Sequence, residues 1–238
     1  MKLDILAIAS HPDDVELGAS GTLIKAKQAG KKIGILDLTR GELGSRGTAE
    51  SRDQEAQAAS EIMRLDVRVN LGMPDGFFEN KKSNQILIIE QIRKYKPDVV
   101  LINAPSDRHP DHGRGAALAK DACFLSGLIK IKTQLNEEQQ NAWRPKSVYH
   151  YIQDYYIKPD LVIDISDVYE KKIAAIQAYE SQFYNPDFDG PDTPISGKDF
   201  FEALKGRWRD MGRYIGTEFG EGFVFTRPVG TDLITDLS

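Results

Sequence analysis

Cysteine is nearly absent from this chain of 238 residues, which contains a single one, Cys123. One cysteine excludes an internal disulfide framework and is typical of a protein kept in a reducing compartment, so we expect a cytoplasmic location. Cys123 lies in an apolar helical stretch, residues 116–128, where the expected role is that of a buried core thiol.

Excess positive charge and long apolar runs are also missing. The chain has 31 Lys and Arg against 36 Asp and Glu, a net charge of −5 that argues against nucleic-acid binding. No apolar run approaches the ~20 residues that span a bilayer. No small-residue cleavage site precedes His11, so the first apolar stretch predicts a strand rather than a signal peptide. Neither a GxGxxG nor a Walker loop follows that strand, which disfavours nucleotide binding. We therefore expect neither a nucleic-acid nor a membrane partner.

Apolar segments alternate with helical patterns through the first half of the chain. Strands are predicted at residues 3–9, 32–38, 67–71 and 99–103, and helices at residues 15–29, 48–64, 84–95 and 113–128. This alternation predicts βαβ units, an α/β fold and a mostly parallel sheet. The length allows one domain with a single core, so we expect one domain over residues 1–238.

The second half is less regular. We expect strands at residues 147–156, 161–165 and 222–225, the last as an edge strand, and helices at residues 167–183 and 200–216. The polar residues 133–144 predict a surface helix or an excursion from the domain. Residues 185–197 contain three prolines and predict a loop that acts as a mobile lid.

Two similar motifs follow the first and fourth predicted strands. Residues 11–14 read HPDD and residues 109–112 read HPDH, and together they contain three of the four histidines. Either motif alone is explained by helix capping and turn chemistry. In the usual doubly wound order, however, strands one and four are neighbours, and their exits face each other where the strand order reverses. The pair therefore predicts a metal or acid–base site in that crevice.

The side chains of the two motifs suit a catalytic metal. Two imidazoles and one carboxylate, without thiolates, are typical of a zinc site that keeps a position open for water, and Fe²⁺ is compatible with the same set. A second carboxylate of HPDD is then free to act as general base. The spacing leaves open whether Asp13 or Asp14 binds the metal. His109 and Asp111 predict an imidazole–carboxylate pair that favours the protonated ring.

These motifs resemble those of the LmbE-like, or PIG-L, zinc-dependent N-deacetylases, whose signature is an AHPDD loop plus an HPDH loop. The similarity extends to residues 39–42 (TRGE), Arg52 with Glu55, residues 73–75 (MPD) and residues 220–223 (GEGF). Residues 179–183 (YESQF) and the chain length resemble the bacillithiol-biosynthesis branch of this family most. The resemblance implies a Rossmann-like three-layer αβα sandwich.

The resemblance also implies roles for the residues of both motifs. It implies one zinc ion per chain with three protein ligands: His11, Asp14 and His112. It implies that Asp13 is the general base and that His109, oriented by Asp111, stabilises the charged transition state. The implied reaction removes the acetyl group from an N-acetylglucosaminide, specifically N-acetylglucosaminyl malate, by a cytoplasmic homo-oligomer such as a trimer-based hexamer.

Substrate recognition rests on residues that follow strands two and three. The resemblance implies that Arg52, Asp75 and Glu42 bind the sugar substrate. Arg40, Arg46 and Arg52 would also form a clamp for a carboxylated ligand, because arginine binds carboxylates bidentately, although solvated loop charge explains them equally.

Two positions depart from the family pattern. Ser10 stands where the usual alanine precedes the HPDD motif, and Phe200 stands where relatives supply an aromatic hydroxyl to the oxyanion. Tyr184 or His150 remain open as substitute donors.

Three alternatives remain. One is a deacetylase of another GlcNAc-containing small molecule, and the second is a metal-dependent phosphoesterase, whose two-metal clamp would need more ligands than these loops offer. The third is a non-catalytic sugar- or metal-binding protein, which the additional aspartates disfavour.

Overall fold

The computed structural model describes residues 1–230, and the last eight positions of the single domain expected from the sequence lie outside the described residues. The strands are β1 (Ile5–Ala9), β2 (Ile33–Asp37), β3 (Val67–Asn70), β4 (Val99–Ile102), β5 (Gln134–Leu135), β6 (Glu138–Gln139), β7 (Ser147–Tyr151), β8 (Leu161–Asp164) and β9 (Gly220–Phe225). The helices are α1 (Asp14–Gln28), α2 (Ala49–Met63), α3 (Lys82–Tyr95), α4 (Pro110–Leu125), α5 (Tyr169–Gln177) and α6 (Lys198–Ile215), and a 3₁₀ turn, η1 (Ser166–Val168), precedes α5.

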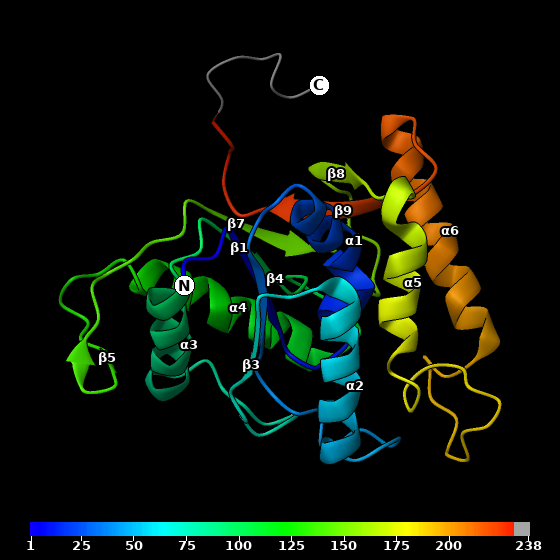
Figure 1. Ribbon diagram of the computed structural model, residues 1–238, viewed down its shortest axis with the longest axis horizontal. Helices are drawn as coiled ribbons and strands as arrows, with labels where there is room; N and C mark the ends of the chain where they lie inside the picture. The colour runs from blue at the N-terminus through cyan, green and yellow to red at the C-terminus, as the bar shows by residue number, and fades with distance from the viewer. Residues whose placement is uncertain (231–238) are drawn as a thin grey trace.

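A seven-stranded sheet with the order β3-β2-β1-β4-β7-β9-β8 forms the middle layer. Neighbours from β3 to β7 are parallel, whereas β9 runs antiparallel to both β7 and β8. Helices α3 and α4 lie on one side of the sheet and α1, α2 and α5 on the other, as Figure 1 shows. The predicted three-layer α/β fold with a mostly parallel sheet is confirmed.

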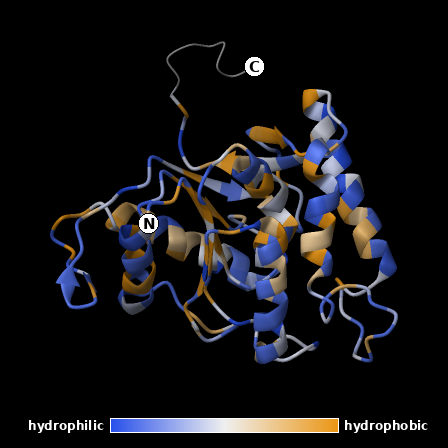
Figure 2. Ribbon diagram, in the orientation of Figure 1, coloured by the Kyte–Doolittle hydropathy of each residue, from blue (hydrophilic) through white to orange (hydrophobic). Residues whose placement is uncertain are grey.

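Each face of the sheet packs against its own apolar cluster. Ala7, Ala9 and Ile35 belong to the cluster under α1, α2 and α5, while Leu6 and Ile8 belong to the cluster under α3 and α4. Strand β1 is apolar at every position because both of its faces are covered. Figure 2 shows the same pattern, with orange central strands and blue residues on the outer helices.

Several boundaries differ from the sequence expectations. Strand β9 lies between β7 and β8 instead of at an edge, because it reverses direction and pairs on both sides. The polar residues 133–144 contain the small β5–β6 pair, so they form an excursion rather than a helix. Helix α4 begins at Pro110, which places His112 in its first turn.

The strand order places the two motifs at one edge of the sheet. Strand β1 has β2 and β3 on one side and β4 on the other, so the direction of winding reverses between β1 and β4. Ligands of open α/β sheets bind beyond the carboxyl ends of the strands at such a point. Both motifs follow the carboxyl ends of these two strands, as the sequence predicted.

Candidate active site

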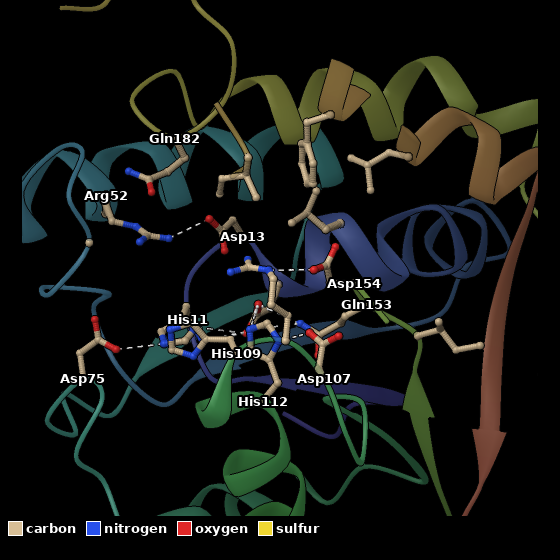
Figure 3. Close-up of a pocket in the computed structure, with 18 of the residues that line it drawn as sticks. His11, Asp13, Arg52, Asp75, Asp107, His109, His112, Gln153, Asp154 and Gln182 are labelled. Atoms are coloured by element: carbon tan, nitrogen blue, oxygen red, sulfur yellow. Dashed lines mark hydrogen bonds and ion pairs between the residues drawn. The ribbon is translucent and has the colours of Figure 1, made fainter. Parts of the chain in front are cut away.

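A cavity of about 260 Å³ opens at this edge of the sheet. Five residues of the two motifs line it: His11, Asp13 and Asp14 of HPDD and His109 and His112 of HPDH. The three imidazoles form its floor and lie close together in Figure 3. The imidazole centroids of His11 and His112 are 5.6 Å apart, and those of His11 and His109 are 4.7 Å apart. The prediction that the two motifs meet is therefore confirmed.

Asp14 lies between two of these rings. One of its carboxylate oxygens is 3.0 Å from His112 Nε2, and the other is 3.8 Å from His11 Nδ1. Asn103 Nδ2 and Gln153 Nε2 each donate a hydrogen bond of 3.0 Å to this carboxylate. The carboxylate is thus fixed against both imidazoles from the end of β4 and from the segment that follows β7.

Each of the two rings has a second carboxylate on its other nitrogen. His112 Nδ1 is 2.5 Å from Asp107 Oδ2, and His11 Nε2 is 2.9 Å from Asp75 Oδ1. Metal-bound histidines typically donate their second ring N–H to a carboxylate in this way, which fixes the tautomer and the ring orientation. His11 Nδ1 and His112 Nε2 are then the nitrogens left to face Asp14.

The pKa values of the His11 and His112 imidazoles indicate a strongly negative environment. Burial disfavours protonation of His11, but its contacts with Asp111 and Asp75 outweigh burial and raise its pKa to about 10. Burial also opposes protonation of His112, yet the Asp14 and Asp107 carboxylates raise its pKa to about 9. An environment that stabilises positive charge on two buried imidazoles would also stabilise a divalent cation.

The donor set fits a zinc ion. Among the described residues, His11, His109 and His112 form one set of donors within 4.8 Å of one another, and His11, Asp75 and Asp111 form another. Both sets contain His11, and in the second set Asp75 and Asp111 face its Nε2. Neither set contains Asp14, whose oxygens lie 3.0 Å from His112 Nε2 and 3.8 Å from His11 Nδ1. Imidazole nitrogens and carboxylate oxygens without thiolates suit Zn²⁺ and also Fe²⁺.

Asp13 is held in an unusual conformation above this floor. Its φ of 103° lies in the left-handed region, and such strain in a non-glycine residue typically costs about 1–3 kcal/mol. The side chain is anchored because the Arg52 guanidinium donates to Asp13 Oδ2 at 2.8 Å and also to the carbonyl of Pro12. Burial raises the pKa of Asp13 to about 7, although Arg52 partly offsets this effect. The strained backbone, the burial and the hydrogen bond from the Arg52 guanidinium mark Asp13 as a candidate base.

Comparisons with known proteins identify the family of this chain. The model of the family described as "PIG-L: GlcNAc-PI de-N-acetylase" matches residues 6–123. Diacetylchitobiose deacetylase from Thermococcus kodakarensis is 30% identical over 189 residues, which cover 75% of this chain and 70% of that relative. The chain belongs to the PIG-L family. It is an N-deacetylase of that family by this relationship.

Two further proteins are similar to this chain. The crystal structure of the conserved protein TT1542 from Thermus thermophilus is 38% identical, with a TM-score of 0.85, and the match covers 96% of this chain and 97% of that chain. The probable N-acetyl-α-D-glucosaminyl L-malate deacetylase 2 from Bacillus subtilis is 26% identical, over 76% of this chain and 84% of the relative.

The structure corrects the pairing expected for His109 in this PIG-L site. His109 caps α4, and its Nδ1 accepts a hydrogen bond of 3.2 Å from the backbone N–H of Asp111. The Asp111 carboxylate instead contacts His11 Nε2, Gly76 N and Arg114. With Nδ1 as acceptor, the neutral ring carries its proton on Nε2. Burial lowers the pKa of His109, and the positive charges on the neighbouring rings lower it further, so the expected protonated ring is not favoured.

The expected carboxylate clamp is not assembled. Arg40 pairs with Asp53 and Glu50, and Arg46 donates to the Ser181 carbonyl, so neither lines the cavity. Arg52 does line the cavity, but its guanidinium faces Asp13. The loop after β2 therefore uses its arginines within the protein, and no local pattern in the sequence indicates their acceptors.

Two other expected substrate residues support the metal site. Asp75 lines the cavity, and its two oxygens accept from His11 Nε2 and from Leu43 N. Glu42 lies outside the cavity lining, and one of its oxygens accepts from Asp75 N at 2.8 Å. The structure therefore places Glu42 behind Asp75 rather than beside a substrate.

Neither candidate for an additional oxyanion donor lies in the cavity lining. His150 is buried, with Nδ1 at 2.7 Å from the Asn103 carbonyl oxygen, and Tyr184 is exposed against Lys198. Phe200 does line the cavity, but it has no hydroxyl group. His109 does line the cavity and is a candidate donor.

The cavity has an apolar wall opposite its polar floor, which the sequence did not reveal. This wall comprises Leu17, Ile152, Ile195, Phe200, Leu204 and Trp208. It comes mainly from α6 and the segment before it, whose amphipathic pattern predicts a buried face without saying what that face covers. Arg108, Asp154 and Arg207 also line the cavity.

Proposed function

We propose that this protein is a metal-dependent deacetylase that hydrolyses the acetamide of a GlcNAc-containing small molecule to acetate and a free amine. The observation that carries the proposal is the geometry of two histidines that both face Asp14, each with a carboxylate on its second nitrogen. Asp13 lies beside this cluster, and its Oδ2 is 2.8 Å from the Arg52 guanidinium. We propose one Zn²⁺ per chain, held by His11, Asp14 and His112.

We assign the steps of the proposed reaction to individual residues of the chain. A bound divalent cation would polarise the amide carbonyl and lower the pKa of a water molecule. Asp13 accepts the proton of the attacking water, because Arg52 engages Oδ2 and leaves Oδ1 for this transfer. His109 donates a hydrogen bond from Nε2 to the oxyanion of the tetrahedral intermediate. Asp13 then delivers the proton to the nitrogen as the C–N bond breaks, which yields acetate and the amine.

The finer proposal concerns the substrate. N-acetylglucosaminyl malate is supported by the relatives with that printed activity and by two guanidinium groups, Arg108 and Arg207, in the cavity lining. Diacetylchitobiose is the alternative that the Thermococcus relative suggests. Arg40 and Arg46 are engaged outside the cavity, so a carboxylated substrate would depend on Arg108 and Arg207. Arg108 pairs with Asp154 at 2.7 Å, and Arg207 donates to the carbonyls of Gln153 and Asp154, so such a substrate would share or displace these contacts. We further propose a cytoplasmic location, in keeping with the single buried cysteine, and a homo-oligomeric assembly, as the family resemblance implies. Among residues 1–230, no helix has the length and apolar character needed to cross a bilayer.

An acetate-release assay tests the proposal. N-acetylglucosaminyl malate, diacetylchitobiose and N-acetylglucosamine are compared in the zinc-loaded protein, with and without a chelator. We expect activity that the chelator abolishes and zinc restores, and metal analysis should give about one ion per chain, as three-ligand catalytic sites bind. Two ions per chain together with phosphate-ester hydrolysis would favour the phosphoesterase instead.

Two variants assign the roles. Asp13→Asn should retain zinc and lose about 10²–10⁴-fold in turnover, which is the typical contribution of a general base. His112→Ala should lose zinc. Near-complete activity of Asp13→Asn would show that another group is the base.

A further inference from the structure

A buried ion pair lies behind the active site, between α1, α5 and β9. Lys172 Nζ is 2.8 Å from Glu221 Oε1, and both side chains are fully buried. Glu221 belongs to the GEGF segment of residues 220–223, to which the sequence assigned no role. A buried ion pair is weak evidence of stabilisation, because its desolvation penalty offsets the attraction between the charges. The contacts of this pair point to another role.

Both members of the pair bind the backbone of α1. Lys172 Nζ donates to the carbonyl oxygens of Glu16 and Leu17, each at 2.8 Å. Glu221 accepts from the N–H groups of Gly21 at 2.9 Å and Thr22 at 2.7 Å. The Leu17 carbonyl and the Gly21 N–H are the two partners of one ordinary i to i+4 helix hydrogen bond. The ion pair therefore supplies a donor and an acceptor to this turn of α1 from outside the helix.

Gly21 permits the close approach of the Glu221 carboxylate to the backbone of α1. A Cβ on Gly21 would lie 3.0 Å from Glu221 Oε1 and 2.8 Å from Ile165, so a larger residue would push the carboxylate away from the helix. Thr22 adds a hydroxyl donor to the same carboxylate at 2.6 Å. On the other side, the Lys172 ammonium lies 4.6 Å from the ring centroid of Trp208, which belongs to the apolar wall.

The turn held by the pair directly follows the catalytic residues. Helix α1 begins at Asp14, and Asp13 is its N-cap. Leu17, whose carbonyl binds Lys172, also lines the cavity. A rotation or shift of this turn would move Asp13 and Asp14 relative to His112, which belongs to α4.

We propose that Lys172 and Glu221 are positioning residues, which act through α1 to hold Asp13 and Asp14 in register with the histidines. The inference rests on the proposed roles of Asp13 and Asp14. Displacement of reacting groups by about 1 Å can reduce turnover by about 10²-fold. The ion pair is thus part of the catalytic geometry, although neither residue touches the substrate.

The test compares Lys172→Met and Glu221→Gln with a matched control. Arg93→Met is the control, because Arg93 is also buried and donates to backbone carbonyls, those of Ser126, Leu128 and Ile131, on the far side of the sheet from α1. All variants are measured as the full chain, at a temperature where circular dichroism shows them folded. Zinc affinity is measured by chelator competition, ligand geometry by the absorption spectrum of the Co²⁺-substituted protein, and kcat and KM with the best substrate found above.

For both variants of the pair we expect zinc affinity to fall about tenfold, as for other residues that orient metal ligands. We also expect an altered Co²⁺ spectrum and a fall in kcat of at least about tenfold with little change in KM. Arg93→Met should lower Tm and leave these quantities unchanged. If the variants of the pair lower Tm but keep the wild-type zinc affinity, Co²⁺ spectrum and kcat, the pair is purely structural and the proposal is wrong. Glu221→Gln decides the matter if Lys172→Met does not fold, since it retains an acceptor for α1. Failure of the proposed function would appear separately, as an inactive wild-type protein.

Discussion

Asp107 Oδ2 lies 2.5 Å from His112 Nδ1, and the Asp107 side chain is fully buried. Its second oxygen accepts from the N–H of Tyr155 at 2.7 Å, so the carboxylate is fixed by a neighbouring segment. This contact sets which His112 nitrogen faces Asp14. Asp107 is therefore a determinant of the metal site, although it lies outside the HPDH motif.

Replacement of Asp107 by Asn should weaken metal binding without abolishing it. Asn retains an acceptor for the Tyr155 N–H but removes the negative charge beside His112, and such changes typically reduce metal affinity about 10–100-fold. Zinc affinity measured by chelator competition checks this. Asp121→Asn is the control, because Asp121 is exposed on the same helix, α4, and contacts Asn80. Equal affinities in the two variants would show that Asp107 does not orient His112.

The sequence predicted the meeting of the two motifs because the alternation of strands and helices determines which strand exits are adjacent. It did not predict Asp107, although the same signal marks that residue, a polar side chain in the exit loop of β4. Asn103 is the last residue of that predicted strand, and its buried amide donates to Asp14. A position at the end of a strand alone does not distinguish such an amide from an ordinary turn residue.

Other parts of the site depend on contacts that no local pattern encodes. Gln153 reaches Asp14 because β7 pairs with β4, and the irregular second half of the chain did not predict this pairing. The acceptors of Arg46 lie about 135 and 145 positions away in the chain. Hydrophobic periodicity predicts secondary structure, whereas the partners of a charged side chain depend on tertiary packing.

Arg46 should affect substrate binding through residues 181–195, the segment after α5 that contributes to the cavity lining. Its guanidinium donates to the carbonyls of Ser181 and Pro191 and lies 4.5 Å from the Phe188 ring centroid. The same segment contributes Ile195 to the apolar wall. We expect Arg46→Ala to raise KM more than it lowers kcat, because the wall loses its support while the metal site is unchanged. Steady-state kinetics check this split.

Arg40→Ala is the matched control for Arg46. Arg40 lies in the same loop, but its guanidinium contacts only carboxylates of α2. We expect its KM to equal that of the wild type. If Arg40→Ala raised KM as much as Arg46→Ala, the result would instead support the hypothesis that these arginines form a clamp for a carboxylated ligand.

Cys123 should be unreactive in the native protein. The thiol is buried, and burial raises its pKa from 9.0 to about 12, so the reactive thiolate is absent at pH 8. Ellman's reagent should label the protein only after denaturation. Because the neutral thiol is favoured in the fold, its contribution to stability is fully present below pH 9 and is lost as pH rises toward about 12. Rapid labelling of the folded protein at pH 8 would contradict this burial.

Gly115 allows α4 to approach β1 closely enough for the histidines to meet. A Cβ at this position would overlap Ser10 Oγ, which donates to the Asp111 carbonyl at 2.8 Å and to Asn103 Oδ1 at 3.1 Å. We expect Gly115→Ala to lower the free energy of unfolding by about 1–3 kcal/mol, the usual effect of overpacking a core. It should also weaken zinc binding, because Asp111 and His112 move with the first turn of α4. Urea denaturation and chelator competition measure the two effects.

Ser10→Ala identifies the cause of that loss. If the overlap with Oγ is responsible, the double variant Ser10→Ala/Gly115→Ala should recover zinc affinity relative to Gly115→Ala alone, and the two substitutions should be coupled by about 0.5–3 kcal/mol, as expected for residues in contact. Gly206→Ala on α6 is the control, because its Cβ would meet nothing within 4 Å. That control should stabilise the protein by about 0.5–1 kcal/mol through helix propensity and leave zinc affinity unchanged. Additive effects at positions 10 and 115 would show that contact between α4 and the HPDD loop does not set the distance between His11 and His112.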